Sequence, residues 1–362
     1  MITKEQLIPK KYLEMSESAI KESIFTKKKE FGDSLTILAH HYQKDEIIPF
    51  ADAVGDSLEL AKIAQGNKKA KHIIFCGVHF MAETADMLTK SDQKVYLPDA
   101  LAGCSMADMA TRRQLEIGWE KLSPQFSEPI IPITYINSTA EVKAFVGDHG
   151  GVIVTSSNAE TILKRILSQN HPVLFLPDQH LGRNTAYHLG VELDEMAVWN
   201  PKKEQLLNYD ESAKLKVVLW QGRCCVHQQY SVKQIEELRE KIPNLKVIVH
   251  PECPLEVVLA SDLYGSTKKI VDEVANSPQG TYWAIGTDNN LVNRMIHNFS
   301  NHNIISIDSS AFSCITMNRI HLAHLLWTLD EIQLGKDTQQ IRVDSRTTTS
   351  ALQALDRMFA YG

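Results

Sequence analysis

Three of the six cysteines in the sequence follow a short apolar segment at nearly the same distance. They are Cys104, Cys224 and Cys314, which stand four to six residues beyond the end of the segment. Thiolates are soft ligands that suit zinc or an iron–sulfur cluster. The chain contains no Cys-x-x-Cys, so a metal site has to combine cysteines from distant segments. Three ligands rather than four would leave one metal position open for a substrate.

The competing interpretation is that these cysteines are small buried hydrophobic residues, which is the commonest role of a free cysteine. Among the others, Cys76 lies inside an apolar segment, and we expect it in the core. Cys225 follows Cys224 directly and would point to the opposite side. Cys253 lies close to the expected site and stays open as an alternative third ligand.

Polar side chains also follow apolar segments at three places, although a buried core does not favour them. Histidine and glutamate are common general acids and bases, and tyrosine can donate a proton to a developing oxyanion. A hydrogen-bond network would explain any single pair, but recurrence at three corresponding places favours one shared site. The pairs are His40 with Tyr42, Tyr135 with Asn137, and His250 with Glu252.

Turns rich in serine and threonine precede three predicted helices, in residues 55–57, 155–158 and 265–267. The free N–H groups and the positive end of a helix make such turns binding sites for phosphate or carboxylate. Ordinary N-capping is a sufficient explanation for any one of them. The chain has no Walker loop and no Gly-x-Gly-x-x-Gly after a strand, so nucleotide binding has little support.

The elements that must position these residues alternate between short β-branched segments and helices of about ten residues. This alternation predicts βαβ units and parallel sheets. It occurs in three stretches, and ADAVGDS at 51–57 aligns with SDLYGST at 261–267. We therefore expect an α/β protein of three similar three-layer αβα domains with small parallel sheets. Ligands bind beyond the carboxyl ends of such strands, so a pseudo-threefold arrangement would bring the three sulfurs to a central site.

The expected domains are residues 1–115, 116–214 and 215–314, with the C-terminal helices of 315–362 joining the first. The polar stretch 181–214 is interpreted as an insertion or connector. A helix is predicted at 321–332, stopped by Gly335, and the last helix, at 350–359, should pack back onto the body.

Composition limits the class of partner. The net charge is −6, which gives no basic footprint for nucleic acid. No apolar run approaches the length of a membrane span, and the N-terminal segment lacks the apolar stretch of a signal peptide. These features lead us to expect a cytoplasmic protein with neither nucleic acid nor membrane as partner.

The motifs, taken in order, resemble those of the quinolinate synthase family across about residues 35–330. The matching segments are ILAHHYQ, ADAVGDSLELA, FCGVHFMAETADML, LPDALAGCSMADM, YINSTAEVKA, WQGRCCVH, VHPECPLEV, GSTKKI and CITMNRI. The resemblance implies three αβα domains around one 4Fe–4S cluster, held by Cys104, Cys224 and Cys314. Its fourth iron would be open and act as a Lewis acid on substrate oxygen atoms.

The resemblance also implies a reaction, in which iminoaspartate condenses with dihydroxyacetone phosphate to give quinolinate, phosphate and two waters. L-aspartate oxidase would be the partner that supplies iminoaspartate. By the same resemblance, His40, Tyr42 and Glu252 would be catalytic. The implied substrate-binding residues are His40, Ser57, Tyr135, Asn137, Ser156, His250, Glu252, Ser266 and Thr267.

Other functions fit parts of the pattern. A cluster-dependent hydro-lyase would use the same three cysteines and open iron on a hydroxy acid. A zinc hydrolase would combine His40, His250 and a cysteine. An electron carrier would normally have four protein ligands, and a radical enzyme that uses S-adenosylmethionine would need a clustered cysteine triplet, which the chain lacks.

Overall fold

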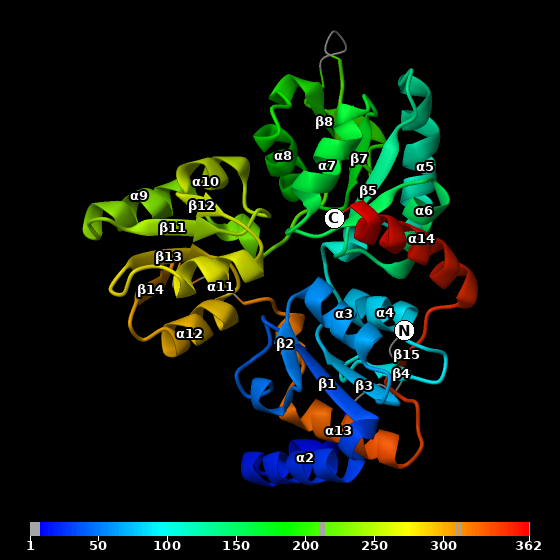
Figure 1. Ribbon diagram of the computed structural model, residues 1–362, viewed down its shortest axis with the longest axis vertical. Helices are drawn as coiled ribbons and strands as arrows, with labels where there is room; N and C mark the ends of the chain where they lie inside the picture. Colours follow the sequence, from blue (N-terminus) through cyan, green and yellow to red (C-terminus); the bar gives the residue numbers. More distant parts are fainter. Residues whose placement is uncertain (1–7, 210–213, 309, 311–312, 362) are drawn as a thin grey trace. The chain divides into compact units, whose positions relative to one another are not determined.

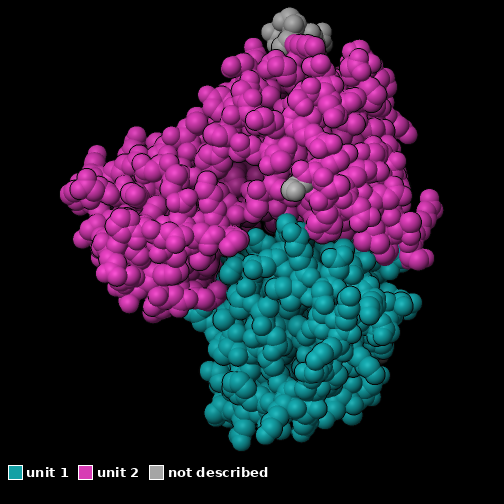
Figure 2. Space-filling model, viewed as in Figure 1, with its two compact units in different colours: residues 1–104, 313–344 teal, residues 105–312, 345–362 magenta. Residues whose placement is uncertain are grey.

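The computed structural model describes residues 8–209, 214–308, 310 and 313–361. The chain forms two compact units, which Figure 2 distinguishes by colour. Unit 1 comprises residues 1–104 and 313–344, and unit 2 comprises residues 105–312 and 345–362. None of the helices in the described part of the chain is both long and apolar enough to cross a membrane.

Unit 1 contains one sheet, with strand order β15-β4-β3-β1-β2. All pairs are parallel except β15 with β4. Every residue of β1 is buried, because helices cover both faces: α3 and α4 lie on one side and α2 and α13 on the other (Figure 1). The strands are β1 Leu35–His40, β2 Ala53–Gly55, β3 His72–Cys76, β4 Lys94–Tyr96 and β15 Gln340–Ile341; the helices are α1 Lys10–Leu13, α2 Glu17–Phe31, α3 Ser57–Gly66, α4 His79–Leu88 and α13 Leu322–Gln333.

Unit 2 contains two sheets. The larger has the order β6-β5-β7-β10-β8-β9 and is parallel except for β8 with β9. Its strands are β5 Ile131–Tyr135, β6 Val152–Val154, β7 Val173–Leu176, β8 Met196–Asn200, β9 Gln205–Leu207 and β10 Val217–Trp220; its helices are α5 Arg112–Leu122, α6 Ala140–Asp148, α7 Ala159–Ser168, α8 Gln179–His188 and α14 Ser345–Tyr361.

The smaller sheet of unit 2 is fully parallel and has the order β12-β11-β13-β14. Its strands are β11 Lys246–Val249, β12 Leu263–Tyr264, β13 Tyr282–Gly286 and β14 Asn303–Ser306, and its helices are α9 Val232–Lys241, α10 Leu255–Ala260, α11 Thr267–Ala275 and α12 Asn289–Asn298. Single 3-10 turns connect elements at Gly32–Ser34, Ile48–Phe50, Ala107–Met109, Ser123–Gln125, Leu193–Glu195, His227–Gln229 and Met317–Arg319.

The predicted fold class is confirmed, since the described residues form three small, mainly parallel sheets with helices around them. The pseudo-threefold arrangement of the domains stays a prediction. The repeat is visible in the hydrogen bonds of the first and third sheets. Asp52 accepts a bond from the N–H of Ile37 in β1, and Asp262, 210 positions later, accepts the same bond from Val247 in β11.

Residues 181–214 were expected to be an insertion or connector. Their described residues complete α8 and supply β8 and β9, which extend the larger sheet beyond β10, so they agree with an insertion. One expectation differs from the structure. The C-terminal segment does not join one domain as a whole. Helix α13 belongs to unit 1, and its predicted end is confirmed by the left-handed Gly335, whereas α14 belongs to unit 2. There Arg357 of α14 donates to the carbonyls of Gly147 and Gly151.

Candidate active site

The three cysteines selected by their spacing each begin the same local structure. A 3-10 turn starts three residues after the cysteine, and the N-cap residue of a helix stands seven residues after it. In each case the N3 side chain accepts a hydrogen bond from the N–H of the N-cap residue, as in a capping box. These bonds measure 3.1 Å at Thr111, 2.8 Å at Ser231 and 3.3 Å at His321. Each cysteine therefore stands the same number of residues before a capped helix.

The cysteines differ in exposure. Cys104 and Cys314 in unit 1 and Cys224 in unit 2 are partly exposed, and Cys225 is exposed. Cys76 is buried in β3, which confirms the core prediction, and burial raises the pKa of its thiol to about 12. Burial, together with the charge of Glu252, also raises the pKa of Cys253 well above its ordinary value. A thiol that resists ionisation is a poor metal ligand, which weakens the case for Cys253.

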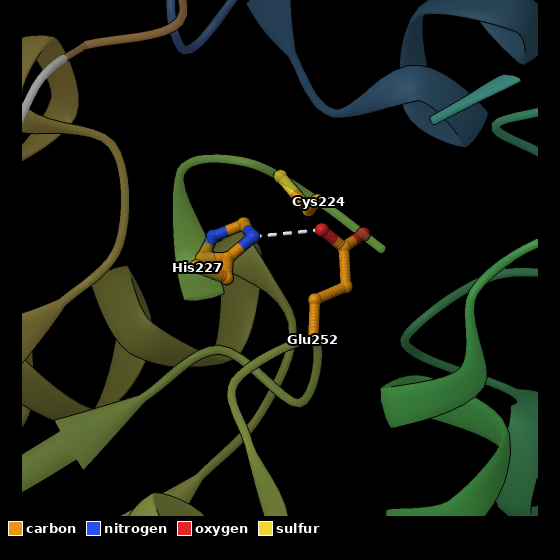
Figure 3. A group of neighbouring side chains, drawn as sticks. All are labelled: Cys224, His227 and Glu252. Carbon is orange, nitrogen blue, oxygen red and sulfur yellow. Dashed lines mark hydrogen bonds and ion pairs between the residues drawn. The ribbon is translucent and has the colours of Figure 1, made fainter. Parts of the chain in front are cut away.

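A buried group of polar residues lies beside Cys224 in unit 2. We call it the Glu252 cluster: Tyr135, Cys224, His227, His250 and Glu252. Glu252 and His250 follow the end of β11, and Tyr135 ends β5. The Nδ1 of His227 lies 2.7 Å from the Oε2 of Glu252, and Figure 3 shows this ring and carboxylate facing each other, with Cys224 on the loop beside them. The Nε2 of His227 lies 3.2 Å from the hydroxyl of Thr287.

Within the Glu252 cluster, Glu252 carries the negative charge. The rings of His227 and His250 stack with their centroids 4.4 Å apart. Burial, followed by the charge of His227, lowers the pKa of His250 to about 3, so this ring is neutral at neutral pH. Burial alone would raise the pKa of Glu252, but His227 and a hydrogen bond with Tyr135 outweigh it and lower the pKa. Glu252 is therefore a buried carboxylate held ionised by its partners.

A second buried carboxyl group, Asp178, lies at the N-cap of α8. It accepts hydrogen bonds from the N–H groups of His180 and Leu181. Burial and the charge of Glu252 nevertheless raise the pKa of Asp178 well above its ordinary value, against the effect of backbone N–H groups that include that of Cys224. The pKa values of the two carboxyl groups are thereby shifted in opposite directions. Glu252 favours the negative charge, and Asp178 holds a proton more readily.

In unit 1, His40 and Tyr42 occupy the positions that His250 and Glu252 occupy in unit 2. The Nδ1 of His40 accepts the N–H of Tyr42 at 3.1 Å, just as the Nδ1 of His250 accepts the N–H of Glu252 at 3.3 Å. The rings of His40 and Tyr42 meet edge to face at 4.7 Å. The same turn therefore carries different chemical groups in the two units.

The predicted anion-binding residues lie at helix N-termini as expected from their turns. Ser57 is the first residue of α3 and Thr267 the first of α11, while Ser266 is the N-cap of α11 and is bonded to the N–H of Lys269. Ser156 precedes α7, and Asn137 follows β5. The side-chain Oδ1 of Asn137 is buried and makes no hydrogen bond in the described structure, so it is available to a ligand.

The chain resembles known proteins over nearly its whole length. The family model described as quinolinate synthetase A protein matches residues 22–360. The quinolinate synthases of Listeria innocua, Listeria monocytogenes and Bacillus subtilis are 55%, 54% and 52% identical to this chain. Each alignment covers 98% of this chain and 96–97% of the relative.

The chain belongs to the quinolinate synthetase A family. Among solved structures, a reductase of E-1-hydroxy-2-methyl-but-2-enyl-4-diphosphate from Plasmodium falciparum gives a TM-score of 0.32 at 12% identity, over 88% of this chain and 94% of that one. That score is too low to indicate a shared fold.

Membership of the quinolinate synthetase A family implies a 4Fe–4S cluster, and the donors of this chain fit one. Three partly exposed cysteines occur in the same type of turn, and each stands seven residues before the N-cap of a helix. The other thiols are either buried with a raised pKa or, at Cys225, outside the repeated spacing.

Three residues of this site in the quinolinate synthetase A chain were not predicted from the sequence: Asp178, His227 and Thr287. One signal could have identified His227. It stands three residues after Cys224, where the corresponding residues after the other two cysteines are the apolar Ala107 and Met317. A histidine at a position that is otherwise buried and apolar indicates a polar partner in the fold.

Proposed function

We propose that this protein is a quinolinate synthase that condenses iminoaspartate with dihydroxyacetone phosphate, releasing phosphate and two waters. The observation that carries the proposal is the Glu252 cluster, in which buried acid and base groups lie beside a cysteine of the repeated turn. Loss of two waters and closure of an aromatic ring require several proton transfers. A buried carboxylate with a histidine and a tyrosine as partners supplies the groups for them.

Cys104, Cys224 and Cys314 would hold one 4Fe–4S cluster. When bound, the cluster would supply an open iron that acts as a Lewis acid on substrate oxygen atoms. The likeness of the three turns supports this assignment, because one local structure presents all three thiols.

Glu252 would accept a proton from the substrate in a dehydration step. Its low pKa keeps it ionised, and the Nδ1 of His227 at 2.7 Å can then share that proton. Tyr135 would orient the carboxylate through its hydrogen bond, and the neutral ring of His250 would position the substrate. His40 and Tyr42 would contribute substrate positioning and proton transfer from unit 1.

The substrates carry carboxylates and a phosphate, and the chain offers serine and threonine hydroxyls at helix N-termini to bind them. Ser57, Ser266 and Thr267 would serve at α3 and α11, and Ser156 and Asn137 would serve in the larger sheet of unit 2. L-aspartate oxidase would supply iminoaspartate. A cytoplasmic location fits the dependence on reduced thiols, and we propose no nucleic acid and no membrane as partners.

The direct test is an anaerobic assay of the iron-loaded protein with dihydroxyacetone phosphate and freshly generated iminoaspartate. Quinolinate and phosphate should appear in equal amounts. The same protein given a hydroxy acid should not dehydrate it, which separates this function from that of a cluster-dependent hydro-lyase. Absence of quinolinate from protein with a full complement of iron and sulfide would overturn the proposal.

A further inference from the structure

The Glu252 cluster brings together three different metal-binding groups. The sulfur of Cys224, a ring nitrogen of His227 and a carboxylate oxygen of Glu252 all lie within 4.8 Å of one another (Figure 3). His227 and Glu252 are 1% and 2% exposed, while Cys224 is partly exposed and gives access from solvent. All three belong to unit 2. A thiolate, an imidazole and a carboxylate are ligand types of zinc sites that have three protein ligands and leave the fourth position for water or substrate.

We propose that these three residues bind a single divalent transition-metal ion, of the class of zinc or ferrous iron, when the chain carries no iron–sulfur cluster. The ion takes the place of the proton between His227 and Glu252. Nitrogen and oxygen ligands each about 2.1 Å from a tetrahedral ion lie about 3.4 Å apart. Since the Nδ1 of His227 and the Oε2 of Glu252 are 2.7 Å apart, a small rotation of these side chains makes room for the ion.

The surroundings of the two buried ligands are those of a metal site. The hydroxyl of Thr287 lies 3.2 Å from the Nε2 of His227, which favours the proton on Nε2 and leaves the lone pair of Nδ1 for the ion. Tyr135 holds the carboxylate of Glu252 through a hydrogen bond. Hydrogen bonds from neighbouring residues to the ligands, like these two, fix the orientation of metal-binding histidines and carboxylates.

The other two cysteine turns provide a comparison within the chain. Three residues after Cys104 and Cys314 the chain has Ala107 and Met317, which offer no imidazole. The proposed set of ligands is therefore specific to the turn of Cys224. Because Cys224 is also a proposed cluster ligand, the ion and the cluster should exclude each other. This mutual exclusion is the part of the inference that rests on the proposed function, in which Cys224 binds the cluster.

Cobalt titration of the full chain, freed of iron and kept anaerobic, tests the proposal. We expect one Co²⁺ per chain, with the near-ultraviolet absorption of a cobalt–thiolate bond, and displacement of cobalt by zinc. Cys224→Ala should lose this absorption, and Glu252→Gln should weaken cobalt binding at least tenfold. The matched controls are Cys104→Ala and Cys314→Ala, which should keep both the absorption and the affinity.

The proposal fails if Cys224→Ala keeps the thiolate absorption, if Glu252→Gln binds cobalt as tightly as the wild type, or if Cys104→Ala and Cys314→Ala lose the absorption too. In the last case the ion would lie among the three cysteines. Should Glu252→Gln not fold, Thr287→Val replaces it and should weaken binding about 10- to 100-fold through the orientation of His227. Activity is not the readout, so absence of quinolinate synthesis in a cobalt-binding protein would overturn only the proposed function.

Discussion

Single residues of unit 2 show how the pKa values of two neighbouring buried carboxyl groups are shifted in opposite directions. Glu252 has two hydrogen-bonding partners, His227 and Tyr135, that favour its ionised form. Asp178 is also buried, and burial and the charge of Glu252 outweigh the backbone N–H groups that favour its ionised form. Groups whose pKa values are driven in opposite directions are typical of acid and base pairs in active sites.

The role of Glu252 can be measured with an isosteric change. Glu252→Gln removes the proton acceptor and should lower quinolinate turnover by about 100-fold or more, the usual contribution of a general base. The iron and sulfide content should stay that of the wild type. Glu256→Gln, at an exposed position four residues later, is the control and should leave turnover within about twofold. Turnover of Glu252→Gln near the wild-type rate would contradict the proposed role.

His180 predicts a dependence of stability on pH. Its ring is 8% exposed, neither ring nitrogen has a hydrogen-bond partner in the described structure, and burial together with the charges of Arg183 and Arg223 lowers its pKa to about 4. The unfolded chain binds this proton near pH 6.5, so the free energy of unfolding should fall as the pH drops from about 6.5 to about 4. The loss from this group should be about 3 kcal/mol.

Urea denaturation at pH 7 and pH 4.5 measures this loss. His180→Asn should lose less stability on acidification than the wild type. His188→Asn, on the exposed side of the same helix, should follow the wild type. Equal pH dependence of His180→Asn and the wild type would show that this ring does not resist protonation.

At the scale of elements, the C-terminal helix is held by a close approach to α6. A Cβ atom on Gly147 of α6 would lie 1.8 Å from the backbone carbonyl oxygen of Ser350 in α14. No side chain fits there, so the absence of a Cβ allows the two helix backbones to touch. Arg357 then bonds to the carbonyl of the same glycine. This contact fixes α14 on unit 2.

Gly147→Ala should therefore force α14 away and lower the free energy of unfolding by about 1–3 kcal/mol, the usual cost of overpacking. Gly66→Ala is a matched control, because Gly66 also lies near a helix end but has open space around its missing Cβ. It should be neutral or stabilising by up to about 1 kcal/mol. The urea midpoints of the two variants and the wild type measure the difference. A Gly147→Ala protein as stable as Gly66→Ala would mean that α14 is not held by this contact.

At the scale of the whole molecule, the first and third sheets repeat one pattern 210 positions apart. Cys104 and Cys314, His40 and His250, and Asp52 and Asp262 are such pairs. The middle sheet departs from the pattern through β8 and β9, which lie between its β7 and β10 in sequence. In all three sheets, however, the cysteine follows a strand of the sheet, β4, β10 or β14.

A cysteine scan tests whether the whole molecule builds one cluster from these three turns. Cys104→Ala, Cys224→Ala and Cys314→Ala should each lose the cluster after anaerobic reconstitution. Cys253→Ala should keep it, because that thiol is buried in the core of the third sheet. Iron and sulfide per chain and the visible absorbance are the measurements. Retention of the cluster in Cys314→Ala together with its loss in Cys253→Ala would replace Cys314 by Cys253 as third ligand.

Local patterns predicted much of this structure. The alternation of apolar segments and helices gave the α/β class, and the turn at 261–267 was recognised from its likeness to 51–57. The two strands within residues 181–214 were not predicted, because β8 and β9 are short and polar residues separate them. The division of the C-terminal segment was also missed, since the contact between Gly147 and Ser350 joins residues far apart in the chain.

The sequence by itself determined the elements, their repetition and the spacing of the cysteines, because these depend on neighbours within a few residues. Only the tertiary structure decided that His227, 25 residues before Glu252, would be its partner and that Asp178 would be the second carboxyl group. Charge and proton position depend on burial and on partners that the fold brings into contact. Residue type and spacing alone predict neither the burial of a side chain nor its partners in the fold.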